Sequence, residues 1–138
     1  DSFCVDRHRE SFMELIDNYV DIVFSNESEL LSLFKKDKLS NCQGDLSSLC
    51  ELVVVTLGSN GSLIINKNAI EVIKSITKGK IIDTTGAGDI YAGGFIHGLI
   101  KNYSLKKCGE IGSICAGQII TQLGSRSNID FRELIRKI

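Results

Sequence analysis

The feature that most constrains this chain is the run of residues 83–89, Asp-Thr-Thr-Gly-Ala-Gly-Asp, in which a glycine-rich turn follows one acid and precedes another. The residues after it, up to Ile100, repeat apolar side chains at helical spacing, so the turn lies at the N-terminus of a predicted helix. Backbone N–H groups at such an end lack intrahelical acceptors and carry the positive end of the helix dipole. Without bulky side chains in the way, they can converge on a phosphate or a developing oxyanion.

Asp89, directly after the second glycine, favours phosphoryl transfer over simple anion binding. A carboxylate at this place repels a bound phosphate and so weakens phosphate binding. Its presence is explained if the carboxylate must take a proton from an attacking hydroxyl. Phosphoryl transfer needs such an acceptor and positive dipoles around the moving charge. Asp89 supplies the first, and the amides of Gly86, Ala87 and Gly88 supply the second. A helix cap with a tight glycine turn is the alternative, and it explains neither acid.

The same run, followed by an apolar helix rich in small residues, resembles the C-terminal signature of the ribokinase-like (PfkB) family of sugar and nucleoside kinases. The resemblance implies a three-layer α/β/α fold with a mostly parallel sheet, ATP as phosphoryl donor and a hydroxymethyl group as acceptor. It makes Asp89 the catalytic base and places the anion hole at Gly86, Ala87 and Gly88. Residues 3–9 are similar to adenosine-kinase-like bacterial members, which favours adenosine among the sugars and nucleosides that remain open as acceptors.

Asn26 and Glu29 form a second candidate site, at the start of a predicted helix that follows a predicted strand at residues 21–24. They share the first helical turn, where an amide oxygen and a carboxylate with bound waters suit Mg²⁺. The family's Asn-x-x-Glu motif, which organises Mg²⁺ and phosphate, falls on these two residues. The alternative is an N-cap followed by acids that complement the helix dipole.

A third set of candidates follows the apolar run 52–57, which predicts a central parallel strand covered on both faces. Residues 58–61 turn the chain into a returning strand at 62–65, so a hairpin is expected. The family places Thr-x-Gly-x-x-Gly under the nucleotide, and Thr56, Gly58 and Gly61 match it, with Ser59 in the turn. A hairpin that requires glycines explains this stretch equally well when it is taken alone.

The resemblance also assigns residues around the predicted helix 105–123, against which the family lays adenine. Ser113 falls where the family often has an adenine-contacting side chain, although the usual residue there is Asn. In some members of the family, the first acid and the second threonine of this run help to hold a monovalent cation. The corresponding residues here are Asp83 and Thr85, so the resemblance implies a possible K⁺ site at these two residues.

Size and composition fit one globular domain over residues 1–138, with 43% hydrophobic and 24% charged residues. The formal net charge of −1 gives no reason to expect nucleic acid or an anionic membrane as a partner, and no apolar run is long enough for a transmembrane helix. Five cysteines without a C-x-x-C pair indicate reduced thiols in the cytoplasm. Because no Met opens the chain and nothing corresponds to the family's lid and acceptor half, we expect the C-terminal portion of a kinase, with homodimerisation open for the full-length protein.

Two other functions stay open at this point. Gly86-x-Gly88-x-x-x-Ala92 resembles a relaxed Rossmann fingerprint and raises a dinucleotide-binding oxidoreductase. Against it, Asp89 would face the pyrophosphate, and no strand ending in an acid is expected after the helix. The other is an inactive nucleotide-binding fragment that keeps the ATP side of a kinase without its acceptor pocket.

The hydrophobic pattern predicts the remaining elements. We expect a strand tail at 3–5, a helix to residue 19 capped by Asp6 or Ser11, a short helix at 45–50, a strand pair or edge at 69–76, a β-prone run at 80–82 and a last helix at 130–138. Thr84 or Thr85 is expected to cap the central helix. Phe12, Leu15, Ile16 and Tyr19 are expected to form the apolar stripe of the first helix.

Overall fold

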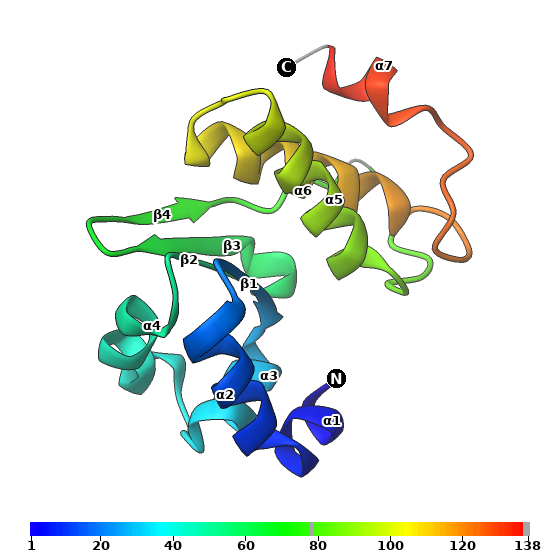
Figure 1. The fold of residues 1–138 in the computed structure, drawn as a ribbon. Coiled ribbons are helices and arrows are strands. Elements are labelled where there is room, and N and C mark those ends of the chain that lie inside the picture. Colours follow the sequence, from blue (N-terminus) through cyan, green and yellow to red (C-terminus); the bar gives the residue numbers. More distant parts are fainter. Residues whose placement is uncertain (78, 137–138) are drawn as a thin grey trace. The chain divides into compact units, whose positions relative to one another are not determined.

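The computed structural model describes residues 1–77 and 79–136, and its four strands form one sheet in the order β1-β2-β3-β4 (Figure 1). The strands are β1 (Ile22–Asn26), β2 (Leu52–Thr56), β3 (Ser62–Asn66) and β4 (Ile70–Ile73). β1 and β2 run parallel. The connections that follow β2 and β3 are of hairpin length, too short for parallel crossovers. The sheet of this chain is therefore mixed, and only its first pair has the parallel arrangement that the sequence predicts for most of it.

Seven α-helices and two short 3₁₀ helices accompany these strands in the described part of the chain. The helices are α1 (Ser2–Arg7), α2 (Arg9–Tyr19), α3 (Glu27–Phe34), α4 (Gln43–Leu49), α5 (Ala87–Ile100), α6 (Leu105–Ile119) and α7 (Phe131–Ile135), with η1 (Leu39–Cys42) and η2 (Gly58–Asn60). The chain divides into two compact units. The first comprises residues 1–57 and 63–71, and the second comprises residues 58–62 and the chain from residue 72 on.

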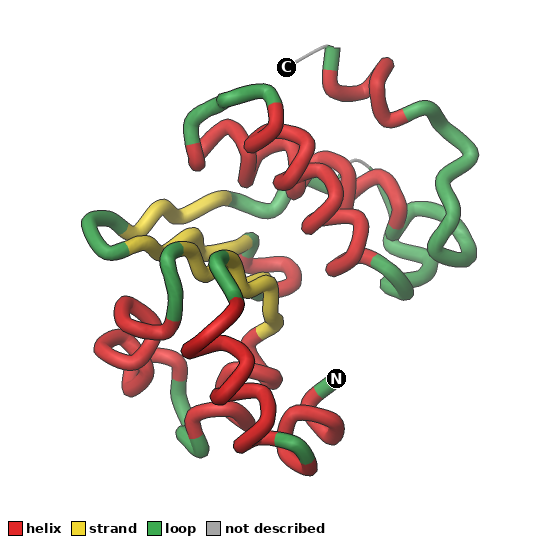
Figure 2. The backbone as a smooth tube through the Cα atoms, viewed as in Figure 1, coloured by secondary structure: helices red, strands yellow, loops and turns green. Residues whose placement is uncertain are grey.

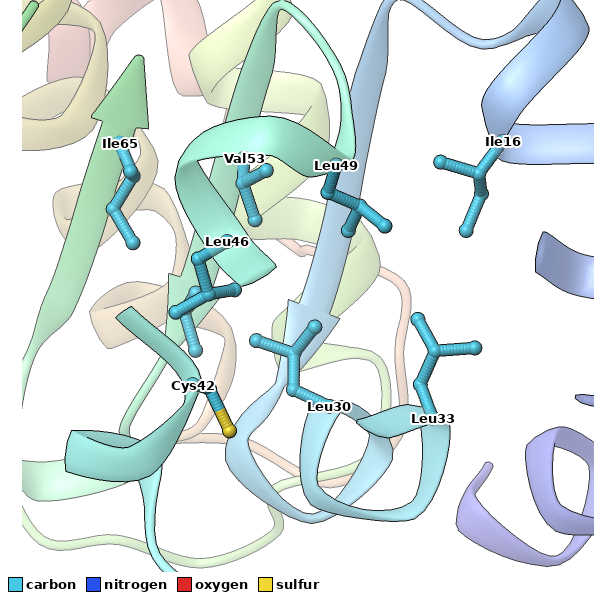
Figure 3. Close-up of a cluster of buried hydrophobic side chains, with 9 residues drawn as sticks. Ile16, Leu30, Leu33, Cys42, Leu46, Leu49, Val53 and Ile65 are labelled. Carbon is cyan, nitrogen blue, oxygen red and sulfur yellow. The ribbon is translucent and has the colours of Figure 1, made fainter. Parts of the chain in front are cut away.

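The core of the first unit is a cluster of aliphatic side chains from helices and strands (Figure 3). β2 contributes Val53 and Val55 to this cluster. Val53, Val54 and Val55 are all fully buried, as the continuous apolar run predicts for a strand covered on both faces. Helices α2, α3 and α4 each contribute side chains to the cluster. Its buried members are Ile16, Leu30, Leu33, Cys42, Leu46, Leu49, Val53, Val55 and Ile65.

The second unit is built on the helix pair α5 and α6, which lie side by side and are joined by a short loop (Figure 2). Glycines allow the close approach: a Cβ atom on Gly94 would lie 3.0 Å from the Cα atom of Gly112, and one on Gly98 would lie 2.9 Å from the sulfur of Cys108. The apolar face of α6 is buried and consists of Cys108, Ile111, Cys115 and Ile119. Ser104 caps α6, because its side chain accepts a hydrogen bond from the amide of Lys107.

Several predicted boundaries of the N-terminal segment are wrong. Residues 2–7 form helix α1 rather than the tail of a strand, because the side chain of Asp1 accepts a hydrogen bond from the amide of Cys4 at 2.8 Å and caps a helical turn. Helix α2 begins at Arg9 after His8, so neither Asp6 nor Ser11 caps it. Its predicted apolar stripe is only partly buried, with Ile16 inside and Tyr19 exposed.

Three predictions near the central run also differ from the structure. Residues 80–82 are irregular rather than β, and the amide of Ile82 donates to the carbonyl of Ile120 at 2.8 Å. The N-cap of α5 is Gly86, not a threonine. Helix α6 ends at Ile119, before the predicted residue 123.

The last helix, α7, is capped by Asp130 and ends at Ile135; residues 137 and 138 of its predicted span lie outside the described residues.

Candidate functional site

The glycine-rich turn lies at the start of α5, as predicted. Gly86 is the N-cap residue and has φ +77°, in the left-handed region that favours glycine. A Cβ atom at this position would also lie only 2.6 Å from the Cβ atom of Ser125 in the loop after α6. Conformation and space therefore both require glycine at residue 86.

Two amides of this turn are free to bind a ligand. The N–H of Ala87 donates to the carbonyl of Thr84 at 3.2 Å, and the N–H of Ile90 donates to the carbonyl of Gly86. For the N–H groups of Gly86 and Gly88, the described part of the chain supplies no acceptor. Asp89 lies in the first turn of α5 with an exposed side chain. Gly86 and Gly88 thus place two unpaired backbone donors beside a carboxylate that a substrate can reach.

Asp83 fastens this turn to the loop after α6. One carboxylate oxygen accepts from the amide of Thr85 and the other from the amide of Gly124, both at 2.9 Å. These hydrogen bonds favour the charged form, so the pKa of Asp83 is held below its ordinary value, first by the Thr85 amide, then by the Thr85 hydroxyl and the Gly124 amide. The two predicted K⁺ ligands, Asp83 and Thr85, are therefore in contact.

Asn26 and Glu29 form a capping box at the start of α3. The side-chain oxygen of Asn26 accepts from the amide of Glu29 at 2.9 Å and from the hydroxyl of Ser28 at 2.8 Å, while Oε2 of Glu29 accepts from the amide of Asn26 at 2.9 Å. The structure thus contains the N-cap that the sequence indicates as the alternative to a Mg²⁺ site. Among the described residues, no three His, Cys, Asp or Glu side chains are grouped to hold a metal. The other carboxylate oxygen of Glu29 lies 3.4 Å from the N-terminal ammonium group. Because the side-chain oxygens of Asn26 and Glu29 already have partners, an ion here would be held through water, as Mg²⁺ often is.

Thr56 lies beside this capping box in the first unit. In the parallel pair β1/β2, Asn26 and Thr56 are register partners at the carboxyl ends of the two strands. The hydroxyl of Thr56 donates to the carbonyl of Ser25 at 3.4 Å. Ligands of open α/β sheets bind outside the carboxyl ends of parallel strands, so two motifs distant in the sequence meet where this rule places a site.

The turn after β2 contains Gly58, Ser59 and Gly61. Gly58 and Gly61 have φ +58° and +93°, and the amide of Gly61 donates to the carbonyl of Gly58 at 3.1 Å. A Cβ atom on Gly61 would lie 1.9 Å from the carbonyl oxygen of Ile73, so the turn packs directly on the backbone after β4. Ser59 is exposed within η2.

Ser113, the predicted adenine contact on α6, is buried and bonded to the backbone. Its hydroxyl donates to the carbonyl of Lys74 at 3.1 Å and accepts from the amide of Ile76 at 3.0 Å. Gly117, one turn further along, lies so close to the same segment that a Cβ atom would be 1.8 Å from the carbonyl oxygen of Ile76. The small residues of α6 thus admit a neighbouring backbone at these two positions.

Two polar residues near the site were missed by the reasoning from sequence. Ser62 and Tyr91 share a buried hydrogen bond of 2.6 Å between their hydroxyl groups. Helical spacing marks residue 91 only as one of the apolar positions after the glycine turn. In the structure, burial raises the pKa of the Tyr91 phenol. The available signal was the hydroxyl itself, since a buried tyrosine usually needs a hydrogen-bond partner.

The segment after α5 argues against a dinucleotide-binding oxidoreductase. A Rossmann unit continues from its first helix into a second strand. Here the chain passes from α5 into the capped helix α6, and the described residues beyond α5 contain no strand.

A protein-family model described as "pfkB family carbohydrate kinase" matches residues 2–132. The chain belongs to the PfkB family. It is 34% identical over 122 residues to a nucleoside kinase of Methanocaldococcus jannaschii, a match that covers 88% of this chain and 39% of that protein. Two solved structures also resemble it, a probable sugar kinase from Rhizobium etli CFN 42 and an adenosine kinase from Sinorhizobium meliloti.

Both of those structures have a TM-score of 0.95 to this chain, at 37% and 36% identity respectively. Each comparison covers 99% of this chain and 42% of the solved chain. The ribokinase-like α/β fold class predicted from the sequence is therefore confirmed. The PfkB chain spans about two fifths of the length of these relatives. No helix in the part of the chain that the structure describes is long and apolar enough to cross a membrane.

Proposed function

We propose that the protein carrying this chain is an ATP-dependent kinase that phosphorylates the hydroxymethyl group of a sugar or nucleoside. The observation that carries the proposal is the start of α5, where the unpaired amides of Gly86 and Gly88 stand beside the exposed carboxylate of Asp89. Membership of the PfkB family supports it. The same proposal includes a small-molecule acceptor. It also includes a cytoplasmic location, which the five cysteines without a C-x-x-C pair suggest.

In the proposed reaction, Asp89 accepts the proton of the hydroxymethyl group as its oxygen attacks the γ-phosphorus of ATP. A phosphorus–oxygen bond forms to the acceptor, the bond to the β-phosphate oxygen breaks, and ADP leaves. The amides of Gly86 and Gly88 stabilise the charge on the transferred phosphoryl group. Ala87 was assigned to the same anion hole, but its amide already donates to Thr84, so the proposal rests on its two neighbours.

Other predicted residues take supporting roles. Asn26 and Glu29 would hold Mg²⁺ through water, and bound Mg²⁺ would offset the charge of the phosphates. Thr56, Gly58, Ser59 and Gly61 are assigned to the nucleotide on the family resemblance. We assign Ser113 to support of residues 74–76 rather than to direct contact with adenine, because its hydroxyl is bonded there. Asp83 and Thr85 remain the proposed K⁺ ligands.

Adenosine is our first choice of acceptor. The support is the resemblance of residues 3–9 to adenosine-kinase-like members and the likeness to the Sinorhizobium meliloti adenosine kinase. An assay of ATP-dependent phosphorylation with adenosine, other nucleosides, ribose and fructose tests this choice. A clear preference for a sugar would leave the kinase proposal standing and overturn the choice of adenosine.

The decisive experiment on the kinase proposal is Asp89→Asn. We expect phosphotransfer by the full-length protein to fall about 10²-fold or more while ATP binding remains, because the variant keeps the turn but loses the proton acceptor. Asp45→Asn is the matched control, since Asp45 also lies in the first turn of a helix, α4. Near-normal turnover in Asp89→Asn would remove Asp89 from the proposed role.

A second candidate function is that of a nucleotide-binding fragment without catalysis. This candidate applies to the 138 residues by themselves, which span 39% of the Methanocaldococcus jannaschii nucleoside kinase and 42% of the two solved structures. Titration of the 138-residue chain with ATP, followed by a phosphotransfer assay on the same sample, tests this candidate. Transfer by the 138 residues excludes it, whereas binding without transfer supports it and leaves the kinase proposal for the full-length protein to the Asp89→Asn experiment.

A further inference from the structure

Ser62 and Tyr91 form a buried polar contact next to the proposed catalytic turn. Their hydroxyl oxygens are 2.6 Å apart, and the residues are 1% and 4% exposed. Ser62 opens β3 immediately after the turn of residues 58–61, and Tyr91 lies two residues after Asp89 in α5. The contact therefore joins the turn that we assign to the nucleotide with the helix that carries the proposed base, and both ends belong to the second unit.

Tyr91 is fixed from its other side by α6. A Cβ atom on Gly112 would lie 2.8 Å from the carbonyl oxygen of Tyr91 and 3.1 Å from its ring. The ring of Tyr91 also stacks on that of Phe95, with 6.4 Å between the ring centroids. The phenol therefore has little freedom, and its hydroxyl is presented to Ser62 from a defined place.

The turn of residues 58–61 has a second attachment to the same helix pair. Gly61 packs against the backbone of Ile73 and Ser75, and Ser113 of α6 bonds the carbonyl of Lys74 and the amide of Ile76. Two routes thus lead from the turn to the helices, one through Ser62 and Tyr91 and one through residues 73–76. Such double support fixes a loop more precisely than its own turn chemistry can.

We propose that Ser62 and Tyr91 are a positioning pair, which sets the turn of residues 58–61 at the distance from the start of α5 that lets one ATP molecule contact both. This inference rests on the proposed function, because it takes the turn as a nucleotide contact and the start of α5 as the phosphoryl site. A ligand that reaches only one of the two places gains nothing from the pair. ATP reaches both, whereas AMP has no γ-phosphate for α5.

The test uses Ser62→Ala, Tyr91→Phe and the double variant. Each single change leaves one hydroxyl buried without its partner, which destabilises the chain, whereas removing both hydroxyls is close to neutral for stability. A merely structural hydrogen bond would therefore give a double variant that recovers both stability and ligand binding. A positioning pair would give a double variant that recovers stability alone.

The measurement is the ratio of the dissociation constants of AMP and ATP, obtained by calorimetric titration of the 138-residue chain and its variants. We expect the double variant to bind ATP about 10-fold more weakly with AMP unchanged, a smaller loss than the roughly 10²–10⁴ lost when joint engagement fails completely. The ratio is insensitive to partial unfolding, because a reduced folded fraction lowers both apparent affinities equally. It therefore remains informative for the less stable single variants.

Failure of the inference and failure of the proposed function give different results. An unchanged ratio in all three variants, with ATP bound well by the parent chain, overturns the positioning pair and leaves the kinase proposal intact. A full-length protein that binds neither ATP nor AMP overturns both. In the full-length enzyme, a positioning role predicts a loss in kcat as well, since a displacement of about 1 Å costs about 10²-fold in rate.

Discussion

Asp83 shows how a single carboxylate can hold the backbone of a turn in place. Its carboxylate accepts hydrogen bonds from the backbone N–H groups of Thr85 and Gly124, which are far apart in the sequence. The same loop after α6 also approaches Gly86, because Ser125 fills the space that a side chain there would need. The shape of the proposed anion-binding turn therefore depends on an acid that precedes it.

The lowered pKa of Asp83 predicts how stability changes with pH. Its folded-state pKa lies below the ordinary value of about 3.9, so between the two pKa values the unfolded chain binds more protons than the folded chain. The contribution of Asp83 is therefore complete above about pH 5 and is lost as the pH falls through the folded-state value. We expect Asp83→Asn to lower the urea midpoint at neutral pH and to reduce its decline on acidification.

Urea unfolding of the parent chain and of Asp83→Asn across the acid range checks this prediction. Asp37→Asn serves as the control, because Asp37 is exposed in the loop after α3. Parallel acid limbs for the parent chain and Asp83→Asn would show that the hydrogen bonds of this carboxylate do not stabilise the folded state.

At the scale of elements, glycine in α6 makes room for a neighbouring segment. Gly117 lies where a Cβ atom would come within 1.8 Å of the carbonyl oxygen of Ile76, which is backbone and cannot turn aside. Gly93 on α5 is the opposite case, exposed and with no described atom within 4 Å of an added Cβ atom. The two helices therefore contain a matched pair of interior glycines with different surroundings.

We expect Gly117→Ala and Gly93→Ala to change the free energy of unfolding in opposite directions. Overpacking against a fixed backbone costs about 1–3 kcal/mol or more, so Gly117→Ala should destabilise the chain. Alanine in an exposed helix interior is favoured over glycine by up to about 1 kcal/mol, so Gly93→Ala should stabilise it. Thermal and urea unfolding of both variants provide the measurement. Equal effects would mean that helix propensity alone governs both positions.

The elements that could be predicted from the sequence are those with local signals. A cap at Asn26 can be recognised because a cap bonds an amide only three residues away, and β2 can be recognised from a continuous apolar run. The β-prone run 80–82 failed because composition does not tell whether a strand partner exists, and here Ile82 bonds the end of α6 instead. The bounds of α6 failed at its C-terminus, where no glycine follows directly.

For the candidate site too, features with a local sequence signal could be predicted, whereas contacts between distant segments could not. The glycine turn and Asp89 could be found because they are neighbours in the sequence. The contacts of Tyr91 with Ser62, and of Ser113 with residues 74–76, join segments about 30 or more residues apart, and no periodicity encodes them. These contacts decide which side chains are available to a ligand: the hydroxyl of Ser113 is bonded to residues 74–76 and is therefore not free to contact adenine.

For the chain as a whole, selective stabilisation by ATP is the prediction that separates the kinase from a dinucleotide-binding protein. A ligand that binds only the folded chain stabilises it by about 2.7 kcal/mol at a concentration of 100 times its Kd. We expect ATP with Mg²⁺ to raise the thermal midpoint of the 138-residue chain and NAD⁺ to leave it unchanged, because in the proposed site the acid and the unpaired amides at the end of α5 would meet a terminal phosphate. Asp89→Asn should keep the ATP response, since it removes the base but not the amides. A larger rise of the thermal midpoint with NAD⁺ than with ATP would contradict the kinase proposal, although the chain belongs to the PfkB family.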